Sequence, residues 1–335
     1  MPDTPEDFFE GARRLSRDLR SASITLSERE ARFLVDAYYA MQRDRIRAGH
    51  QTRTLTESAE PHDVLLWLEN QRDTLERQVA RALDAYSGSL QIGQWARSQV
   101  GIGPIISAGL ACHIDIRQAP TVGHIWRFAG LDPTNKWLGR KSAETIVDDI
   151  WKQAKGEEAA LLVAKAINVR LELFLKRLQD RKTGEVKITK QTLTAAAARL
   201  PWNASLKRLC FIIGESFVKV SGNPDAHYGR AYSVRKQRET EKNANGDYAD
   251  QAAQALREKR WGDDTLAKKH YENGMLPPAR IHMRAKRWAT KLFLAHYHHV
   301  LYEITFGTQP PLPYIMAKDP LLHTTFIGPP NWPMD

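Results

Sequence analysis

Apolar residues recur at helical spacing along most of the chain. Ser27 and Glu30 have the spacing of a capping box, which satisfies backbone amides at the start of a helix. An amphipathic helix is predicted from this point to about Arg47, followed by a polar break from His50 to Pro61. The apolar positions on which this helix depends are Phe33, Leu34, Ala37, Tyr38 and Met41.

A second and longer periodic run covers residues 62–86 and ends at Ser87 and Gly88. Charged residues separate its apolar positions, as in a helix that pairs with another helix. Two interpretations stay open: an intramolecular hairpin with the preceding helix, or a coiled coil that forms a homodimer. The apolar positions are Leu65, Leu68, Leu75, Val79 and Leu83.

Residues 92–114 predict a short helix, a glycine turn and a helix of small residues. Gly101, Ile102 and Gly103 form the turn, and Pro104 suits the first position of the following helix. Backbone amides at such a helix start can hold a phosphate without reading a base. The pattern indicates a helix-hairpin-helix that binds DNA, although many helical hairpins use a glycine turn only to reverse the chain.

The rest of the chain also favours helices. A helical stretch is expected over 142–179, with a heptad-like apolar series in 161–178, and further helices over 189–200 and from 201 onward. No run of alternating strands occurs, so the fold class is predicted to be all-α or nearly so. The proline-rich end is expected to form an extended strap over the helical body, because it carries many large apolar groups.

These patterns suggest four parts. Residues 1–26 are a polar arm, 27–90 a helical hairpin or coiled coil, and 306–335 the proline-rich tail. The remaining part, 91–305, is a helical DNA-binding domain with an inserted helical segment at about 143–200.

Two segments combine basic residues with helical spacing. The first, 228–242, carries Arg230, Arg235 and Lys236. The second, 281–300, has an apolar stripe and a basic stripe, so that one face suits a core and the other suits phosphates. The alternative is a solvated basic face that binds nothing. The apolar stripe is Ile281, Ala285, Trp288, Leu292 and Ala295, and the basic stripe is Arg280, Arg284, Arg287 and Lys291.

Composition narrows the class of partner. The chain has 335 residues with 49 Lys+Arg against 39 Asp+Glu, a net charge of +10, which points to nucleic acid or another polyanion. Cys112 and Cys210 have apolar neighbours and offer neither a disulfide framework nor a cysteine metal site. The acidic start is unlike a signal peptide, and no stretch is apolar enough for a membrane span. We expect a cytoplasmic protein with no membrane partner.

Five histidines lie close together in sequence near the end of the chain, which raises the question of a metal site. Their spacing does not put three on one helix face, and no carboxylate stands at ligand spacing. We therefore expect no metal and no cofactor. The histidines are His270, His282, His296, His298 and His299.

Two spaced motifs resemble a known family. Residues 100–108, with the letters GIGP, are followed by 124–133, which contain AGLDP. This arrangement is similar to the C-terminal domain of the transposases related to insertion sequences 110, 116 and 902. The close match covers about 92–142, and the letters from Trp202 to Arg208 loosely resemble that family's next helix start.

The resemblance implies a protein that acts on DNA. In that family an N-terminal domain with four acidic residues works with a serine nucleophile shortly after the AGLDP turn. Ser142 is the nearest match here, and Arg140 and Lys141 beside it are suited to stabilising a phosphoryl-transfer state. The alternative is that Ser142, followed by Glu144 and Thr145, is the N-cap residue of a helix, and this role is the one that the sequence favours. The first ninety residues are predicted to be helical, so the acidic domain is missing, together with the metal ions it would hold.

The sequence therefore favours a DNA-binding protein of transposase type from a mobile element, with RNA as an alternative ligand. A serine recombinase that needs a partner domain or a guide RNA in trans is a second hypothesis, which leaves open whether the chain is an enzyme. A third is a helical assembly protein that dimerises through 62–86.

Overall fold

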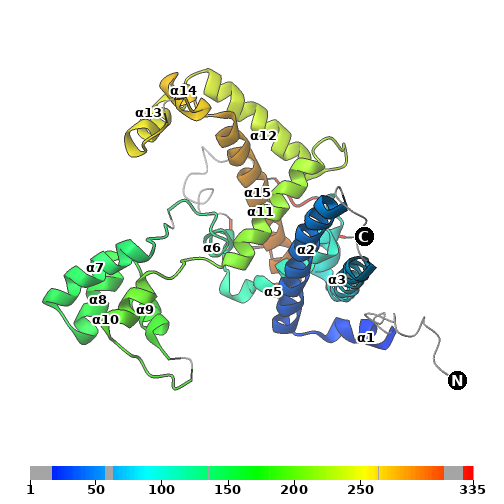
Figure 1. Ribbon diagram of the computed structural model, residues 1–335, viewed down its shortest axis with the longest axis horizontal. Helices are drawn as coiled ribbons and strands as arrows, with labels where there is room; N and C mark the ends of the chain where they lie inside the picture. Colours follow the sequence, from blue (N-terminus) through cyan, green and yellow to red (C-terminus); the bar gives the residue numbers. More distant parts are fainter. Residues whose placement is uncertain are drawn as a thin grey trace. The chain divides into compact units, whose positions relative to one another are not determined.

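The computed structural model describes residues 17–56, 63–134, 136–180, 182–262, 264–312 and 327–334. Regular structure in these ranges is helical, and their one β-bridge joins Gln179 to Val186. The predicted all-α fold class is thus confirmed. The chain divides into two compact units (Figure 1), of which unit 1 comprises Met1–Trp126 and Ser205–Asp335, and unit 2 comprises Arg127–Ala204.

The helices of unit 1 come from both parts of its sequence, and two of them, α6 and α11, begin or end at the connections to unit 2. They are α1 (Arg17–Ala22), α2 (Glu28–Thr56), α3 (Asp63–Ser89), α4 (Gln91–Arg97), α5 (Pro104–His113), α6 (Val122–Phe128), α11 (Ala204–Lys219), α12 (His227–Ala244), α13 (Ala249–Glu258), α14 (Leu266–Glu272) and α15 (Pro278–Phe306). Unit 2 contains α7 (Arg140–Gln153), α8 (Gly156–Ala166), α9 (Leu171–Leu178) and α10 (Lys190–Ala197).

The predicted capping box at the start of α2 is confirmed. The backbone N–H of Ser27 donates to Glu30 Oε2 at 2.8 Å, and the N–H of Glu30 donates to Ser27 Oγ at 3.3 Å. The Ser27 hydroxyl also donates to Glu30 Oε2, at 2.7 Å; this bond, followed by the one from the Ser27 N–H, lowers the pKa of Glu30 because both favour the ionised carboxylate.

The predicted end of this helix was wrong. α2 continues through residues 48–56, where a polar break was expected, and 57–62 lie outside the described residues. Contacts with α3 support the extension: Arg72 Nε lies 3.1 Å from Asp44 Oδ2, and Thr52 donates to Glu69 at 2.5 Å. Local sequence polarity does not report such cross-helix bonds.

α2 and α3 pair with each other within one chain, as the hairpin interpretation predicted. Arg45 Nε lies 2.7 Å from Glu76 Oε2, whose residue is buried between the helices. Homodimerisation through this helix stays a prediction. The inward face of α2 differs from the prediction, because Phe33 is 72% exposed whereas Val35 and Tyr39 are buried.

The core of unit 1 forms around α15 (Figure 1). The Phe293 ring lies 5.9 Å from that of Trp95, 5.6 Å from that of Phe217 and 5.1 Å from that of Tyr228, measured between centroids. These partners belong to α4, α11 and α12, and all four side chains are almost completely buried. A single aromatic cluster therefore joins elements from both sequence segments of unit 1.

The predicted stripes of α15 need correction. Ile281 and Ala285 are buried as expected, but the stripe then continues through Ala289, Phe293 and Tyr297, leaving Trp288, Leu292 and Ala295 half-buried at its edge. Of the basic stripe, Arg284 does not face solvent freely, because it pairs with buried Glu239 at 2.8 Å.

Unit 2 has its own core, to which every one of its helices contributes. Val147, Val163, Phe174 and Leu193 are completely buried in it. The expected continuous helix over 142–179 was wrong: the chain breaks between α7 and α8 and again over 167–170, so the heptad-like series is split between two helices. The predicted insertion lies inside this unit.

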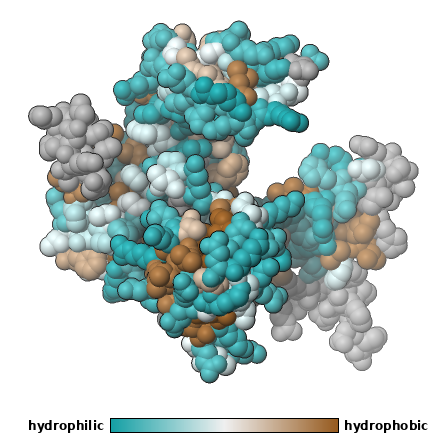
Figure 2. All heavy atoms as spheres, turned by 90° about the vertical axis from the view of Figure 1, so that its left-hand side faces the viewer, coloured by the Kyte–Doolittle hydropathy of each residue, from teal (hydrophilic) through white to brown (hydrophobic). Residues whose placement is uncertain are grey.

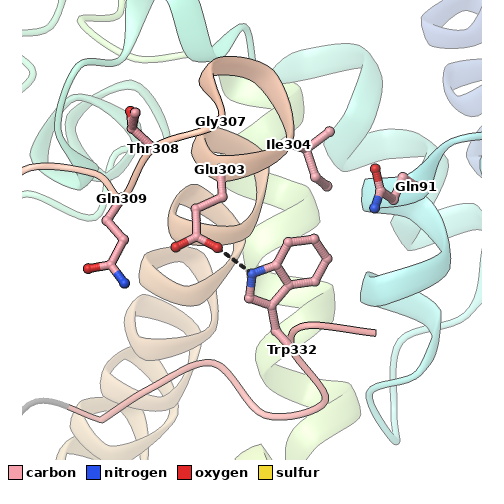
Figure 3. A pocket seen from close by; sticks show the side chains of 7 residues that line it. All are labelled: Gln91, Glu303, Ile304, Gly307, Thr308, Gln309 and Trp332. Atoms are coloured by element: carbon pink, nitrogen blue, oxygen red, sulfur yellow. Dashed lines mark hydrogen bonds between the residues drawn. The ribbon is translucent and has the colours of Figure 1, made fainter. Parts of the chain in front are cut away.

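Residues 327–334 extend along α4 and α15 of unit 1. Trp95 Nε1 donates to the Pro330 carbonyl at 2.9 Å, and Trp332 Nε1 donates to Glu303 Oε2 at 2.6 Å beside a pocket at the end of α15 (Figure 3). His296 Nε2 must donate to the Ile327 carbonyl at 2.8 Å, so its Nδ1 accepts from the Tyr228 hydroxyl. Residues 313–326 of the predicted strap lie outside the described part.

We predict that His296 makes folding sensitive to acid. Burial lowers the pKa of His296 to about 4, so between the ordinary histidine pKa and that value the unfolded chain binds a proton that the folded chain does not. The stabilisation is complete above about pH 6.5 and declines as the pH falls, by about 3 kcal/mol at pH 4. In urea unfolding of His296→Gln, the loss of stability between pH 7 and pH 4 should be smaller by that amount.

The matched control is His50→Gln, which changes an exposed histidine of α2. It should keep the pH dependence of the unaltered protein. Parallel pH profiles for the unaltered and His296→Gln proteins would contradict the assignment.

Candidate nucleic-acid interface

The glycine turn lies between α4 and α5 in unit 1. Gly101 has a φ of 101°, which L side chains rarely adopt, and the Ile102 N–H donates to the Gln99 carbonyl at 2.9 Å. Ile102 is buried and anchors the turn, whereas a side chain at Gly103 would meet no atom within 4 Å. The chain before α5 is therefore fixed in shape and open on one side.

α5 begins at Pro104, as predicted, and has no side-chain cap. The first amides of a helix lack intrahelical partners and carry the positive end of its dipole. The backbone N–H groups at this end of α5 are therefore able to bind a phosphate. The helix-hairpin-helix assignment itself stays a prediction.

α11 supports the turn from behind. Ser216 Oγ donates to the Gly101 carbonyl, and a Cβ at Gly101 would lie 3.2 Å from Val220 Cγ2. The C-terminal segment supports the other side, where Asn331 Nδ2 donates to the Ser98 carbonyl at 3.2 Å. The turn thus has a well-defined position relative to α11.

Basic side chains of α11, α12 and α15 lie near one another, and we call this set the basic face. It comprises Lys207, Lys219, Lys236, His282, Lys286 and Arg287. Lys286 is buried and pairs with Glu215. The Lys286 contact lowers the pKa of Glu215 because it favours the carboxylate.

Positive charges on this face repel one another. Burial and the charge of Arg287 lower the pKa of Lys207. Burial, followed by the charges of Lys286 and Lys236, lowers the pKa of His282. A bound anion would offset the part of each pKa shift that comes from the neighbouring positive charges.

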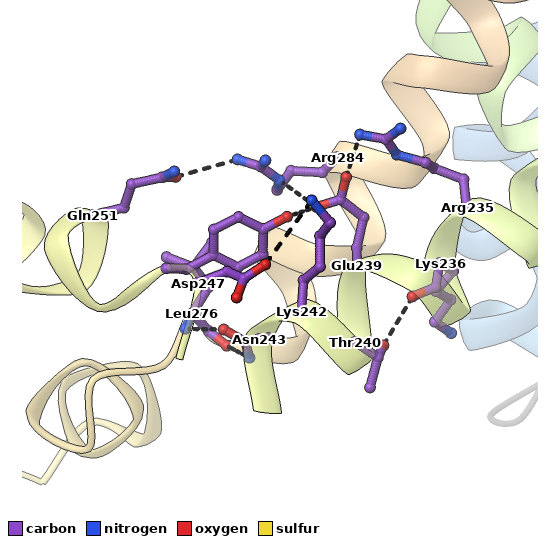
Figure 4. Close-up of polar contacts among 11 residues, drawn as sticks. Arg235, Lys236, Glu239, Thr240, Lys242, Asn243, Asp247, Gln251, Leu276 and Arg284 are labelled. Atoms are coloured by element: carbon purple, nitrogen blue, oxygen red, sulfur yellow. Dashed lines mark hydrogen bonds and ion pairs between the residues drawn. The ribbon is translucent and has the colours of Figure 1, made fainter. Parts of the chain in front are cut away.

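Arg235 and Arg284, which were also predicted to bind nucleic acid, are not part of the basic face and pair with a buried glutamate (Figure 4). Both pair with Glu239, which is 1% exposed and also accepts from the Tyr248 hydroxyl. Burial raises the pKa of Glu239, but the Tyr248 bond and the two guanidinium groups outweigh it and leave the pKa lowered. We therefore place these arginines in the structural framework behind the basic face.

The remaining predicted cations of unit 1 have different surroundings. Lys291 Nζ lies 4.0 Å from the centroid of the Trp126 ring, and Trp126 Nε1 donates to the Lys291 carbonyl at 3.1 Å. Arg230 is exposed on the first turn of α12. Lys291 thus helps to hold α6 against α15.

Arg140, Lys141 and Ser142 lie on unit 2, in the first turn of α7. Arg140 pairs with Glu144 at 3.0 Å, and all three residues are exposed. Gly139 is the N-cap residue of α7 and has a positive φ of 78°. The N-cap therefore lies three residues before Ser142, and the suggestion that Ser142 caps the helix was wrong. Among described residues, no histidine or carboxylate hydrogen-bonds to Ser142 to activate it.

The histidines have structural partners. His296 bonds to Tyr228 and Ile327, His298 Nε2 donates to the Ala119 carbonyl at 2.8 Å, and His299 lies 3.0 Å from Glu303. No group of three His, Cys, Asp or Glu side chains in the described ranges is arranged to hold a metal ion.

Sequence reasoning missed Lys207 and Lys219 because α11 was interpreted only by its apolar face. It also missed how the charge is distributed. Unit 2 has 15 lysine and arginine residues against 9 aspartate and glutamate residues, a net charge of +6, which leaves +4 for unit 1. The predicted insertion, 143–200, holds 11 lysine and arginine residues against 8 aspartate and glutamate residues, so counting charge there gives only +3 and does not find this excess.

Comparison with protein-family models, curated proteins and solved structures finds no match to this chain. No helix in the described part combines the length and the apolar character needed to cross a membrane.

We predict that Glu239 is essential for the stability of unit 1. Glu239→Gln leaves Arg235 and Arg284 without their buried counter-charge, and removing one partner of a buried ion pair costs about 3 kcal/mol or more. Urea unfolding at pH 7 measures this loss. Glu241→Gln, on an exposed residue of the same helix, is the control and should change stability by less than about 0.5 kcal/mol. Equal stability of the two variants would contradict the structural role of Glu239.

Proposed function

We propose that the protein binds DNA through unit 1, and that it acts in DNA transposition or recombination as a binding component. The observation that carries this proposal is the basic face. Lys219, Lys236 and Arg287 are exposed on it, Arg287 lies near Lys207, and Glu215 pairs with the buried Lys286. A polyanion is the ligand that such a surface favours.

The glycine turn adds a second kind of contact. Gly101 packs against α11 at Ser216 and Val220, one helical turn or less from Lys219. Phosphates that contact Lys219 and Lys236 would therefore pass close to the turn, where the first backbone N–H groups of α5 lack partners within the helix. Contacts of both kinds recognise the nucleic-acid backbone and not its bases.

The transposase part of the proposal depends on the resemblance of the GIGP and AGLDP motifs. The described N-terminal region is the helical hairpin of α2 and α3, which offers no sheet on which acidic catalytic residues would stand. We therefore assign the chain a role in holding DNA. Strand transfer through Ser142 gains no support from its surroundings, and RNA is an alternative ligand that binding experiments can compare.

The test uses Lys219→Glu, Lys236→Glu and Arg287→Glu together, all exposed residues of the basic face. If the protein engages about six phosphates, its affinity for duplex DNA should fall by about three orders of magnitude between 50 and 200 mM salt. The triple variant should bind more weakly, and the slope of log affinity against log salt should be less steep by about 3. Fluorescence anisotropy with a labelled duplex measures both quantities.

The matched control reverses the same number of charges on the α2–α3 hairpin, through Arg43→Glu, Arg53→Glu and Arg81→Glu, which are also exposed. It should retain most of the affinity. An equal loss in both triple variants would show that only net charge matters, and salt-independent binding would contradict a phosphate contact.

A further inference from the structure

The excess positive charge of unit 2 is not explained by the basic face of unit 1. Its net charge of +6 resides on 78 residues, more than half of the total of +10. Arg170, Lys176 and Lys182 are exposed and form no ion pair with a described residue. These cations surround α9 and the turn that follows it.

α8 and α9 are joined by a tight turn of four residues, Ile167 to Arg170. Asn168 has a φ of 53°, and the N–H of Val169 donates to the Ala164 carbonyl at 2.9 Å, which closes the end of α8. Asparagine tolerates this left-handed conformation better than most residues. The chain changes direction here, and α9 does not continue the line of α8 (Figure 1).

A shared core fixes the pair. Val163 and Ala164 of α8 and Phe174 and Leu178 of α9 are buried in the core of unit 2. α7 and α10 pack around them, and Thr189 caps α10 through a capping box. The outer face of α9 is thereby held in one orientation.

That outer face combines basic and apolar groups. Glu172, Leu173 and Lys176 are exposed on α9, with Arg170 at its start, and Leu173 is 52% exposed. Figure 2 shows unit 2 from the side on which α7, α8 and α10 are labelled in Figure 1; the surface there is mainly hydrophilic, with hydrophobic side chains gathered within it. A turn closed by the bridge from Gln179 to Val186 follows α9; its exposed Lys182 and Lys187 stand beside Asp180 and Glu185.

We infer that α8 and α9 form a helix-turn-helix that binds double-stranded DNA, with α9 as the helix that enters the major groove. Two helices joined by a turn of three or four residues are the framework of this motif. The major groove of DNA admits an α-helix, with Arg170 and Lys176 placed for phosphates or guanine and Leu173 for a thymine methyl group. Lys182, which is exposed in the turn after α9, would contact the adjacent backbone.

The partner is duplex DNA and not duplex RNA. The major groove of an RNA helix is deep and narrow, so that side chains cannot read it. This site is separate from the basic face, because every residue in it belongs to unit 2. It adds a base-reading element to a protein whose unit 1 contacts are proposed to be with the backbone.

The test compares two double variants of the full chain. Arg170→Gln with Lys176→Gln removes two charges, at the N-cap of α9 and on α9 itself. The control, Lys152→Gln with Lys155→Gln, removes two exposed charges at the end of α7 and the N-cap of α8. We expect the α9 variant to bind duplex DNA about tenfold more weakly, with a salt slope less steep by about 2. The control should change affinity less than about threefold, and circular dichroism should show both variants folded.

A duplex RNA of equal length is the second ligand. Its affinity should change by a similar small amount in both double variants. An unchanged DNA affinity in the α9 variant, an equal loss in the control, or an equal loss for duplex RNA would each overturn the inference.

The triple variant of the basic face separates this inference from the proposed function. If only the α9 variant weakens DNA binding, the basic face fails as a binding surface and the helix-turn-helix stands. If only the triple variant weakens binding, the reverse holds.

Discussion

The packing of α15 against the aromatic rings of α4, α11 and α12 is the contact on which unit 1 depends. Phe293 lies at its centre, between Trp95, Phe217 and Tyr228. Aromatic side chains bury large areas and fix the relative orientation of the helices that carry them. The glycine turn after α4, Lys219 on α11 and Lys236 on α12 take their positions from this one cluster.

Periodicity predicted the helices well, but it did not determine which face turns inward. α15 is surrounded by other elements, so it has apolar residues on several sides, and Trp288 and Leu292 were as plausible in the core as Phe293. The true face is set by neighbours far away in sequence. Lys286, for example, is 4% exposed and has Glu215 as its counter-charge, and helical spacing alone contains no sign of that partner.

The sequence singled out candidate basic residues, but it could not show which of them lie together. Net charge and the glycine turn indicated a polyanion, and Lys236 and Arg287 do lie on the basic face. Arg235 and Arg284 were indistinguishable from them in sequence. The structure separates them because Glu239 stands one helical turn from Arg235 and 45 residues from Arg284, and only folding brings all three together.

The division of unit 1 into two sequence segments also constrains the order in which the chain folds. Unit 2 is continuous, so all the partners of its core are present once residue 204 has been synthesised. Trp95, by contrast, has no aromatic partner until Phe293 and Tyr297 follow about two hundred residues later. Domains generally fold as units during synthesis. We therefore expect unit 2 to fold first. The N-terminal helices would stay accessible to chaperones until α15 has been synthesised and can pack against Trp95.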